Sequence, residues 1–141
     1  MAKKLLIVDD NDDVRMSLRL ALESFGDIVE AGSGAEALRL IASERPRAVV
    51  LDISMPGMGG LEVLRAARAG QPALAVVMLT GEMDLEVARE CLEAGARSYV
   101  TKPFDAQTLR SEIKRLLETG GSEGEADARP WRVAGEKPQE E

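Results

Sequence analysis

Short apolar segments alternate with stretches of helical periodicity along the first 118 residues of the chain. Strands that are buried on both faces of a parallel sheet read as nearly continuous apolar runs. Five runs of this kind are predicted strands: Leu5–Val8, Ile28–Ala31, Ala48–Leu51, Ala75–Leu79 and Ser98–Val100. After each run, apolar residues recur every three or four positions, which predicts a helix. The predicted helices run from Asp12 to Gly26, from Gly34 to the residue before Pro46, over Leu61–Ala69, near Leu85–Ala94, and from about Asp105 to Glu118.

This alternation predicts an α/β fold. Strand–helix units joined by short loops favour a doubly wound, five-stranded parallel sheet with right-handed crossovers and helices on both faces. We expect this domain to span residues 1–119, because the composition changes after Thr119. Residues 120–141 are rich in Gly, Glu, Ala and Pro and almost lack aliphatic side chains, which is typical of an acidic tail or a disordered linker. Trp131 in this tail is either an incidental aromatic residue or an anchor that docks the tail on the domain or on a partner.

Composition narrows the chemistry that the domain can perform. The chain has 141 residues, a net charge of −7, no histidine and a single cysteine, Cys91. Catalysis by Ser-His or Cys-His pairs, metal sites with histidine ligands and internal disulfides are therefore excluded. The acidic balance argues against direct binding to nucleic acid. The longest unbroken apolar run, Ala73–Leu79, has seven residues, whereas a membrane span needs about 20, so we expect a cytoplasmic protein without membrane insertion.

Polar residues follow the predicted strands at the edge where ligands bind in open parallel sheets. These residues are Asp9, Asp10, Asp52, Thr80 and Lys102. Crowded carboxylates repel one another and call for a cation, and hard oxygen ligands suit Mg²⁺. A lysine at the same edge would pair with an anion. The pattern therefore predicts a magnesium-assisted phosphoryl site in which a carboxylate is a possible covalent acceptor.

At this point the sequence resembles a known family, the receiver domain of two-component response regulators, and is similar to the single-domain chemotaxis receivers. The resemblance covers roughly residues 3–118 and implies the flavodoxin-like strand order 2-1-3-4-5. It rests on four motifs in order: Leu6-Ile7-Val8-Asp9-Asp10, Asp52-Ile53-Ser54-Met55-Pro56-Gly57-Met58-Gly59-Gly60, Leu79-Thr80-Gly81 and Tyr99-Val100-Thr101-Lys102-Pro103-Phe104.

The resemblance implies a phosphoacceptor and a metal site. Asp52 would attack the phosphoryl group in line. Asp10 would bind Mg²⁺ directly, and Asp9 would act mainly through a water molecule. The backbone carbonyl of Ser54 and the carboxylate of Asp52 would complete the protein ligands.

The resemblance also implies the residues that respond to phosphorylation. Lys102 would neutralise a phosphoryl oxygen, and the Lys102–Pro103 peptide bond would be cis. Thr80 would donate a hydrogen bond to another phosphoryl oxygen, and Tyr99 would follow by turning inward. Gly81 would keep the backbone beside the phosphoryl group open.

Exposed apolar residues indicate where partners could dock. Met16 and Leu20 lie opposite the predicted buried face of the first helix, and in this family a histidine kinase or histidine phosphotransfer protein docks on that helix. Leu85 and Leu92 are predicted to point away from the face of the fourth helix that carries Cys91, which we interpret as a core residue. Such positions serve phosphorylation-dependent dimers in the family, but Arg110 stands where the transcription-factor subfamily has an apolar contact. We therefore expect a different downstream partner.

Each of these residues also has an ordinary structural interpretation. Asp9 and Asp10 could belong to a solvated turn that leads into the first helix, and we expect Asp12 to cap that helix. Thr80 could be a strand-end hydroxyl group, and Tyr99 could be ordinary packing.

Three functions remain open at this stage. The first is a receiver that takes a phosphoryl group from a partner's phosphohistidine and alters a protein-binding surface. Such a receiver has no turnover beyond self-phosphorylation and autodephosphorylation. The chain could also be the receiver fragment of a larger regulator with an output domain. The second is a phosphotransferase or phosphatase with an aspartyl-phosphate intermediate, although Ser54 stands where its second acid is expected. The third is a pseudo-receiver that serves only as an interaction module.

Overall fold

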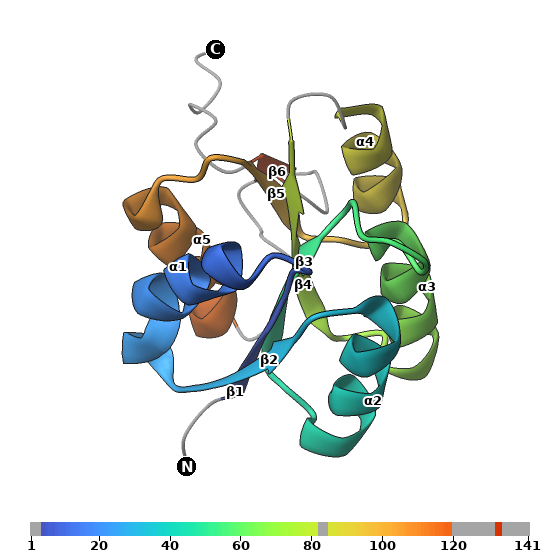
Figure 1. Cartoon of the computed structure of the whole chain (residues 1–141), viewed down its shortest axis with the longest axis horizontal. Coiled ribbons are helices and arrows are strands. Elements are labelled where there is room, and N and C mark those ends of the chain that lie inside the picture. The colour runs from blue at the N-terminus through green and yellow to red at the C-terminus, as the bar shows by residue number, and fades with distance from the viewer. Residues whose placement is uncertain (1–3, 82–84, 120–131, 134–141) are drawn as a thin grey trace.

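A parallel sheet forms the centre of the molecule, and helices cover both of its faces (Figure 1). The structure, a computed structural model, describes residues 4–81, 85–119 and 132–133. The strands lie in the order β2-β1-β3-β4-β5-β6. Their bounds are β1 Lys4–Val8, β2 Asp27–Ala31, β3 Ala48–Asp52, β4 Ala75–Thr80, β5 Ser98–Thr101 and β6 Arg132–Val133. The helices are α1 Asp12–Leu22, α2 Gly34–Glu44, α3 Gly60–Gly70, α4 Leu85–Glu93 and α5 Ala106–Thr119, with a 3₁₀ turn at Glu23–Phe25.

The two faces of the sheet carry separate apolar cores, because successive side chains of a strand point to opposite faces. Helices α1 and α5 cover one face, and α2, α3 and α4 cover the other (Figure 1). Leu18 of α1 and Ile113 of α5 pack with Ile7 of β1. On the other face, Leu64 of α3 packs with Leu6 of β1. Strands β3 and β4 are buried along their whole length, which explains why they read as unbroken apolar runs.

The predicted fold class is confirmed. Every predicted strand and helix is present, and β1 to β5 lie in the order 2-1-3-4-5 with parallel pairing. The sequence did not predict the sixth strand, in which Arg132 and Val133 pair in parallel with Ser98 and Tyr99 at the outer edge of β5. This pairing gives partners to backbone groups that an edge strand would otherwise leave open. Trp131 lies outside the described residues.

The cap of α1 differs from the prediction. Asn11, not Asp12, is the N-cap: its side-chain oxygen accepts a hydrogen bond from the backbone N–H of Val14 at 3.0 Å. Asp12 is the first residue inside the helix and pairs with Arg15. The prediction was wrong by one residue, since asparagine caps helices as well as aspartate does and Asn11 is the residue with the extended backbone of a cap.

The buried face of α4 also differs from the prediction. Ala88, Cys91 and Leu92 are buried, so Leu92, which is 5% exposed, belongs to the core and is not an exposed docking position. Leu92 follows Ala88 at the i+4 spacing that places two residues on one helix face. Leu85, at the first residue of the helix, is 50% exposed, as predicted. Cys91 is the core residue that the sequence predicted, and burial raises the pKa of its thiol to about 11.

Candidate functional site

The polar residues that follow the strands meet at one edge because their strands are adjacent and parallel. In the register of the sheet, Val8 of β1 pairs with Leu51 of β3, Asp52 of β3 pairs with Leu79 of β4, and Thr80 of β4 pairs with Thr101 of β5. Asp52 and Thr80 are the last residues of β3 and β4, one position inside the strands rather than beyond them. The predicted convergence of carboxylates, hydroxyl and lysine at this edge is present.

Three carboxylates form the centre of the site. Asp9, Asp10 and Asp52 each contribute an oxygen atom, and these atoms lie within 4.8 Å of one another. Asp9 and Asp52 are buried, whereas Asp10 is exposed. The backbone N–H of Asn11 donates to Oδ1 of Asp9 at 2.9 Å, which orients that carboxylate. Three carboxylates so close together repel one another, which favours either protonation of one of them or a compensating cation.

Lys102 supplies one such cation. Its Nζ lies 3.0 Å from Oδ2 of Asp9 and 3.1 Å from Oδ1 of Asp52. The backbone N–H of Lys102 donates to the carbonyl of Thr80 at 2.7 Å, which ties the lysine to β4, and the Lys102–Pro103 peptide bond is cis, as the resemblance implied. Oδ2 of Asp9 nevertheless has no aligned hydrogen-bond donor within the described part of the chain, although the ammonium group is near. One ammonium group thus only partly compensates the carboxylates.

The electrostatics of Asp52 reflect this incomplete compensation. Burial, and then the neighbouring charge of Asp9, raise the pKa of Asp52 to about 6, although Lys102 and the backbone N–H of Ser54 act in the opposite direction. Burial lowers the pKa of Lys102, but the two carboxylates outweigh it and leave that pKa raised. Lys102 is therefore a fixed positive charge, and the Asp52 carboxylate is held in a site that favours a second cation.

The predicted switch residues lie around this centre. Thr80 is fully buried, and its hydroxyl donates to the carbonyl of Gly81 at 3.0 Å. The ring of Tyr99 is partly buried and packs against the core on the α2–α3–α4 face. Ser54 is exposed. Its backbone N–H bonds to the Asp52 carboxylate, which puts Ser54 at the site.

Two residues that hold the site together were missed by the sequence analysis. A Cβ atom on Gly60 would overlap the carbonyl oxygen of Asp52 and would lie 2.8 Å from Cα of Ile53, so only glycine lets α3 start against the strand end. The double glycine after Asp52 was a signal that could have found it. The guanidinium of Arg15 donates to the carbonyl of Asp9 at 2.6 Å and pairs with Glu30 of β2. No local pattern indicates this contact, because β2 and α1 meet only in the folded chain.

An apolar surface adjoins the site. Met16 and Leu20 of α1 are 63% and 65% exposed, as predicted. A cavity of about 570 Å³ lies between α1 and the start of α5, and its lining includes Leu20, Lys102 and Phe104. Lys102 thus connects the acidic centre with this surface.

Comparison with known proteins identifies the family to which this chain belongs. The family model described as the response regulator receiver domain matches residues 5–114, and the chain belongs to this family. The response regulator MprA of Mycobacterium tuberculosis H37Rv is 40% identical over 135 residues, which cover 95% of this chain and 59% of MprA. MprA of Mycolicibacterium vanbaalenii is 44% identical over 118 residues, covering 83% of this chain and 51% of that relative. The chain thus spans between half and three fifths of the length of these relatives.

Solved receiver structures have the same fold. A CheY-like receiver domain protein from Methanospirillum hungatei has a TM-score of 0.81 and 32% identity, and the match covers 85% of this chain and 97% of that one. The BeF3-activated DrrB receiver domain has a TM-score of 0.77 and 33% identity, covering 84% of this chain and 99% of that one. Within the described residues, no helix is long and apolar enough to cross a membrane.

Proposed function

We propose that this receiver is a phosphorylation-dependent switch of the cytoplasm, in which Asp52 accepts a phosphoryl group from a phosphohistidine of a histidine kinase or a phosphotransfer protein. The observation that carries the proposal is the position of the buried Asp52 carboxylate, within 4.8 Å of two other carboxylates and 3.1 Å from the Lys102 ammonium group. Carboxylates whose pKa values are perturbed by burial and by neighbouring like charges cluster at functional sites.

The transfer needs no acid or base from this chain. One oxygen of Asp52 attacks phosphorus while the phosphorus–nitrogen bond to the partner's imidazole breaks, and the imidazole takes a proton from solvent. Phosphoryl transfer depends mainly on positioning and on neutralising the oxygens. The absence of histidine from the chain is consistent with this division of labour, since the partner supplies the histidine.

The donor set fits Mg²⁺, the metal that the family implies. Oδ2 of Asp9 is buried without an aligned donor, and all the nearby side-chain ligands are carboxylate oxygens, which Mg²⁺ prefers. Asp9, Asp10, Asp52 and the carbonyl of Ser54 would hold it. When bound, the ion neutralises carboxylate and phosphoryl oxygens.

The switch follows from the new charge at Asp52. Lys102 would leave its carboxylate partners for a phosphoryl oxygen, and the Thr80 hydroxyl would leave the carbonyl of Gly81 for another. Movement of Thr80 would open space on the side of Tyr99, which is only partly buried and can turn inward. A local charge change of this kind biases a two-state equilibrium and alters the surface that a downstream protein binds.

The exposed apolar residues of α1 support docking of the phosphodonor protein there. Changing Met16 and Leu20 together to Asp should slow phosphotransfer from a cognate partner, because it puts charges where an apolar contact forms. Labelling by acetyl phosphate should stay intact, and Leu85→Asp, a single substitution of the same kind on α4, should leave both rates unchanged. Equal loss in the two assays would contradict docking on α1.

Mass spectrometry of the intact chain tests the main proposal. With Mg²⁺ and acetyl phosphate we expect the addition of one phosphoryl group, and no addition in Asp52→Ala. Turnover of an added phosphate ester without accumulation of modified protein would favour a phosphatase or phosphotransferase instead. No modification, together with no change in the Tyr99 region on adding beryllofluoride, would favour a pseudo-receiver.

A further inference from the structure

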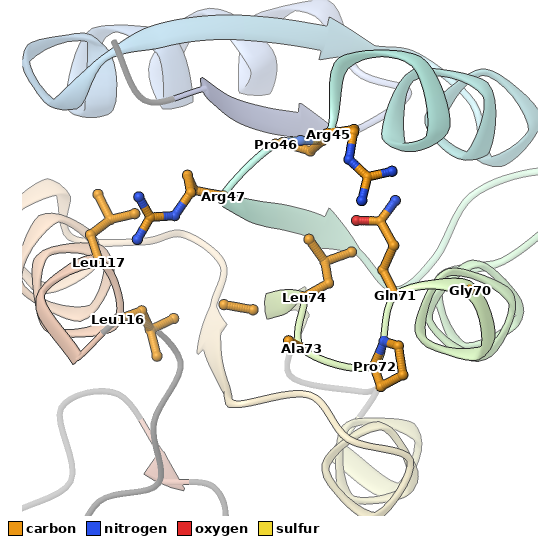
Figure 2. A pocket seen from close by; sticks show the side chains of 11 residues that line it. Arg45, Pro46, Arg47, Gly70, Gln71, Pro72, Ala73, Leu74, Leu116 and Leu117 are labelled. Carbon is orange, nitrogen blue, oxygen red and sulfur yellow. The ribbon is translucent and has the colours of Figure 1, made fainter. Parts of the chain in front are cut away.

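A second cavity opens at the opposite edge of the sheet, where the strands begin. Its volume is about 410 Å³, within the range of roughly 300–1,000 Å³ that is usual for small-molecule sites. Three segments surround it: residues 45–47 after α2, residues 70–75 between α3 and β4, and the end of α5 (Figure 2). The cavity is therefore formed by segments remote from Asp52.

Two guanidinium groups at this cavity have no ion-pair partner among the described residues. Arg45 and Arg47 are exposed, and neither is paired with a carboxylate within residues 4–81 and 85–119. Arg15 and Arg19, in contrast, both pair with Glu30. Although acidic residues outnumber basic ones by 25 to 18 in the sequence, these two neighbouring arginines have no carboxylate partner in the described part of the chain and form a local patch of positive charge.

The backbone of Arg45 is unusual as well. Arg45 follows the last residue of α2 and has left-handed dihedral angles, φ 51° and ψ 60°. Gly or Asn usually takes this position, because a side chain with a Cβ atom is strained there. Strain of this kind is typical of functional sites, and here it is found at the residue that projects its guanidinium over the cavity (Figure 2).

The cavity joins two polar ends across an apolar floor. At one end the Arg45 guanidinium faces the Gln71 amide, and at the other the Arg47 guanidinium points toward Leu117 (Figure 2). The Gln71 amide is held in place, since its Nε2 donates to the carbonyl of Ile41 at 3.2 Å. Leu74 lies between the two ends and is buried.

Charge decides what the cavity can bind. Helices α2 and α3 end at this edge, and the negative ends of their dipoles make the backbone contribution negative. The two guanidinium groups offset this negative charge. Their paired N–H groups can donate two hydrogen bonds to the oxygens of a carboxylate or a phosphate. The leucines favour a ligand with an apolar body.

We propose that this cavity binds a small organic anion, in which a carboxylate or phosphate group is carried on an apolar body. The acidic group pairs with Arg45 or Arg47, and the body covers Leu74 and Leu117. This cavity lies at the opposite edge of the sheet from the phosphorylation site. It gives the receiver a second ligand, which differs chemically from the phosphoryl group.

Heteronuclear NMR on the full chain tests the proposal, with 8-anilinonaphthalene-1-sulfonate as the probe. We expect saturable shifts of backbone amides in residues 45–47 and 70–75. Naphthoate and a nucleoside monophosphate, added as separate competitors, distinguish a carboxylate from a phosphate ligand. Shifts that do not saturate, or that cluster at the cavity beside Lys102, would overturn the proposal.

Matched charge variants test the role of the two arginines. Arg45→Gln with Arg47→Gln should weaken binding about tenfold or more, since charge-assisted hydrogen bonds are lost. Arg39→Gln with Arg89→Gln makes the same change in net charge at exposed positions on α2 and α4 and should leave binding unchanged. If the first pair unfolds the chain, Arg45→Gly, which suits the left-handed backbone, with Arg47→Gln gives the same test. Unchanged affinity in the cavity variants would mean that the arginines only stabilise the helix ends, and the proposal would be wrong.

Discussion

The two edges of the sheet differ in where their charges lie. At the carboxyl edge, Asp9 and Asp52 are buried and share the single ammonium group of Lys102. At the amino edge, Arg45 and Arg47 are exposed and face an open cavity. Burying like charges together costs stability, whereas exposed charges are screened by water. The buried carboxylates therefore lower stability at the carboxyl edge, whereas the exposed arginines at the amino edge carry no such electrostatic cost.

The two ends of α3 provide the test with the largest expected effect. Gly60→Ala should destabilise the chain by more than about 3 kcal/mol, because its Cβ atom would overlap the backbone of Asp52 and Ile53. Gly70→Ala, at the amino edge, has no atom within 4 Å of the new Cβ and should be neutral or stabilising by up to about 1 kcal/mol. Urea denaturation measures both. A similar cost at both ends would mean that the carboxyl edge is not packed more tightly.

Neutralising Asp52 should stabilise the chain when no metal ion is present. The pKa of Asp52 is raised from 3.8 to about 6. The protonated side chain therefore contributes to the free energy of unfolding fully below pH 3.8, and this contribution is lost as the pH rises through about 6. Asp52→Asn removes this loss and should be up to about 3 kcal/mol more stable than the unmodified chain at pH 7.5, with little difference at low pH. Denaturation in EDTA at the two pH values measures the gap. A variant that is less stable at pH 7.5 would contradict crowding as the dominant effect.

Magnesium should stabilise only through the carboxyl edge. At ten times its dissociation constant, a ligand that binds the folded chain alone adds about 1.4 kcal/mol. We expect a rise in Tm with Mg²⁺ for the unmodified chain and for Arg45→Gln with Arg47→Gln, but not for Asp10→Asn. The same rise in Asp10→Asn would place the ion elsewhere.

The smallest effect is expected at the amino edge. Arg45→Gly should raise the free energy of unfolding by about 0.5 kcal/mol, because relief of the left-handed strain slightly exceeds the extra entropy of glycine in the unfolded chain. A clear loss of stability would show that the Arg45 side chain supports the end of α2.

The sequence predicted the fold well, because the fold follows from local pattern. Strands such as β3 and β4 are buried on both faces and read as apolar runs. The two errors each concern a position within one helical turn. The N-cap of α1 is Asn11 rather than Asp12, and Leu92 of α4 faces the core. Periodicity alone assigns a helix face only to within about one residue.

The site was predictable because parallel strands bring their ends to one edge, so Asp9, Asp52 and Lys102 could be placed together before their distances were known. The Gly59-Gly60 pair was a local signal for the role of Gly60 that the sequence analysis did not use, whereas the role of Arg15 was not predicted because it depends on contacts between segments that meet only after folding. The pairing of Arg132 and Val133 with β5 belongs to the same class, since tail composition carries no information about strand partners.

The central claim is that Asp52 is the phosphoacceptor, and borohydride trapping tests it most directly. Borohydride reduces an aspartyl phosphate to homoserine, so peptide mapping after treatment with Mg²⁺ and acetyl phosphate identifies the modified residue. We predict homoserine at position 52 alone, and none when Mg²⁺ is removed. Homoserine at another aspartate, or no homoserine although the chain takes up phosphate, would contradict the claim.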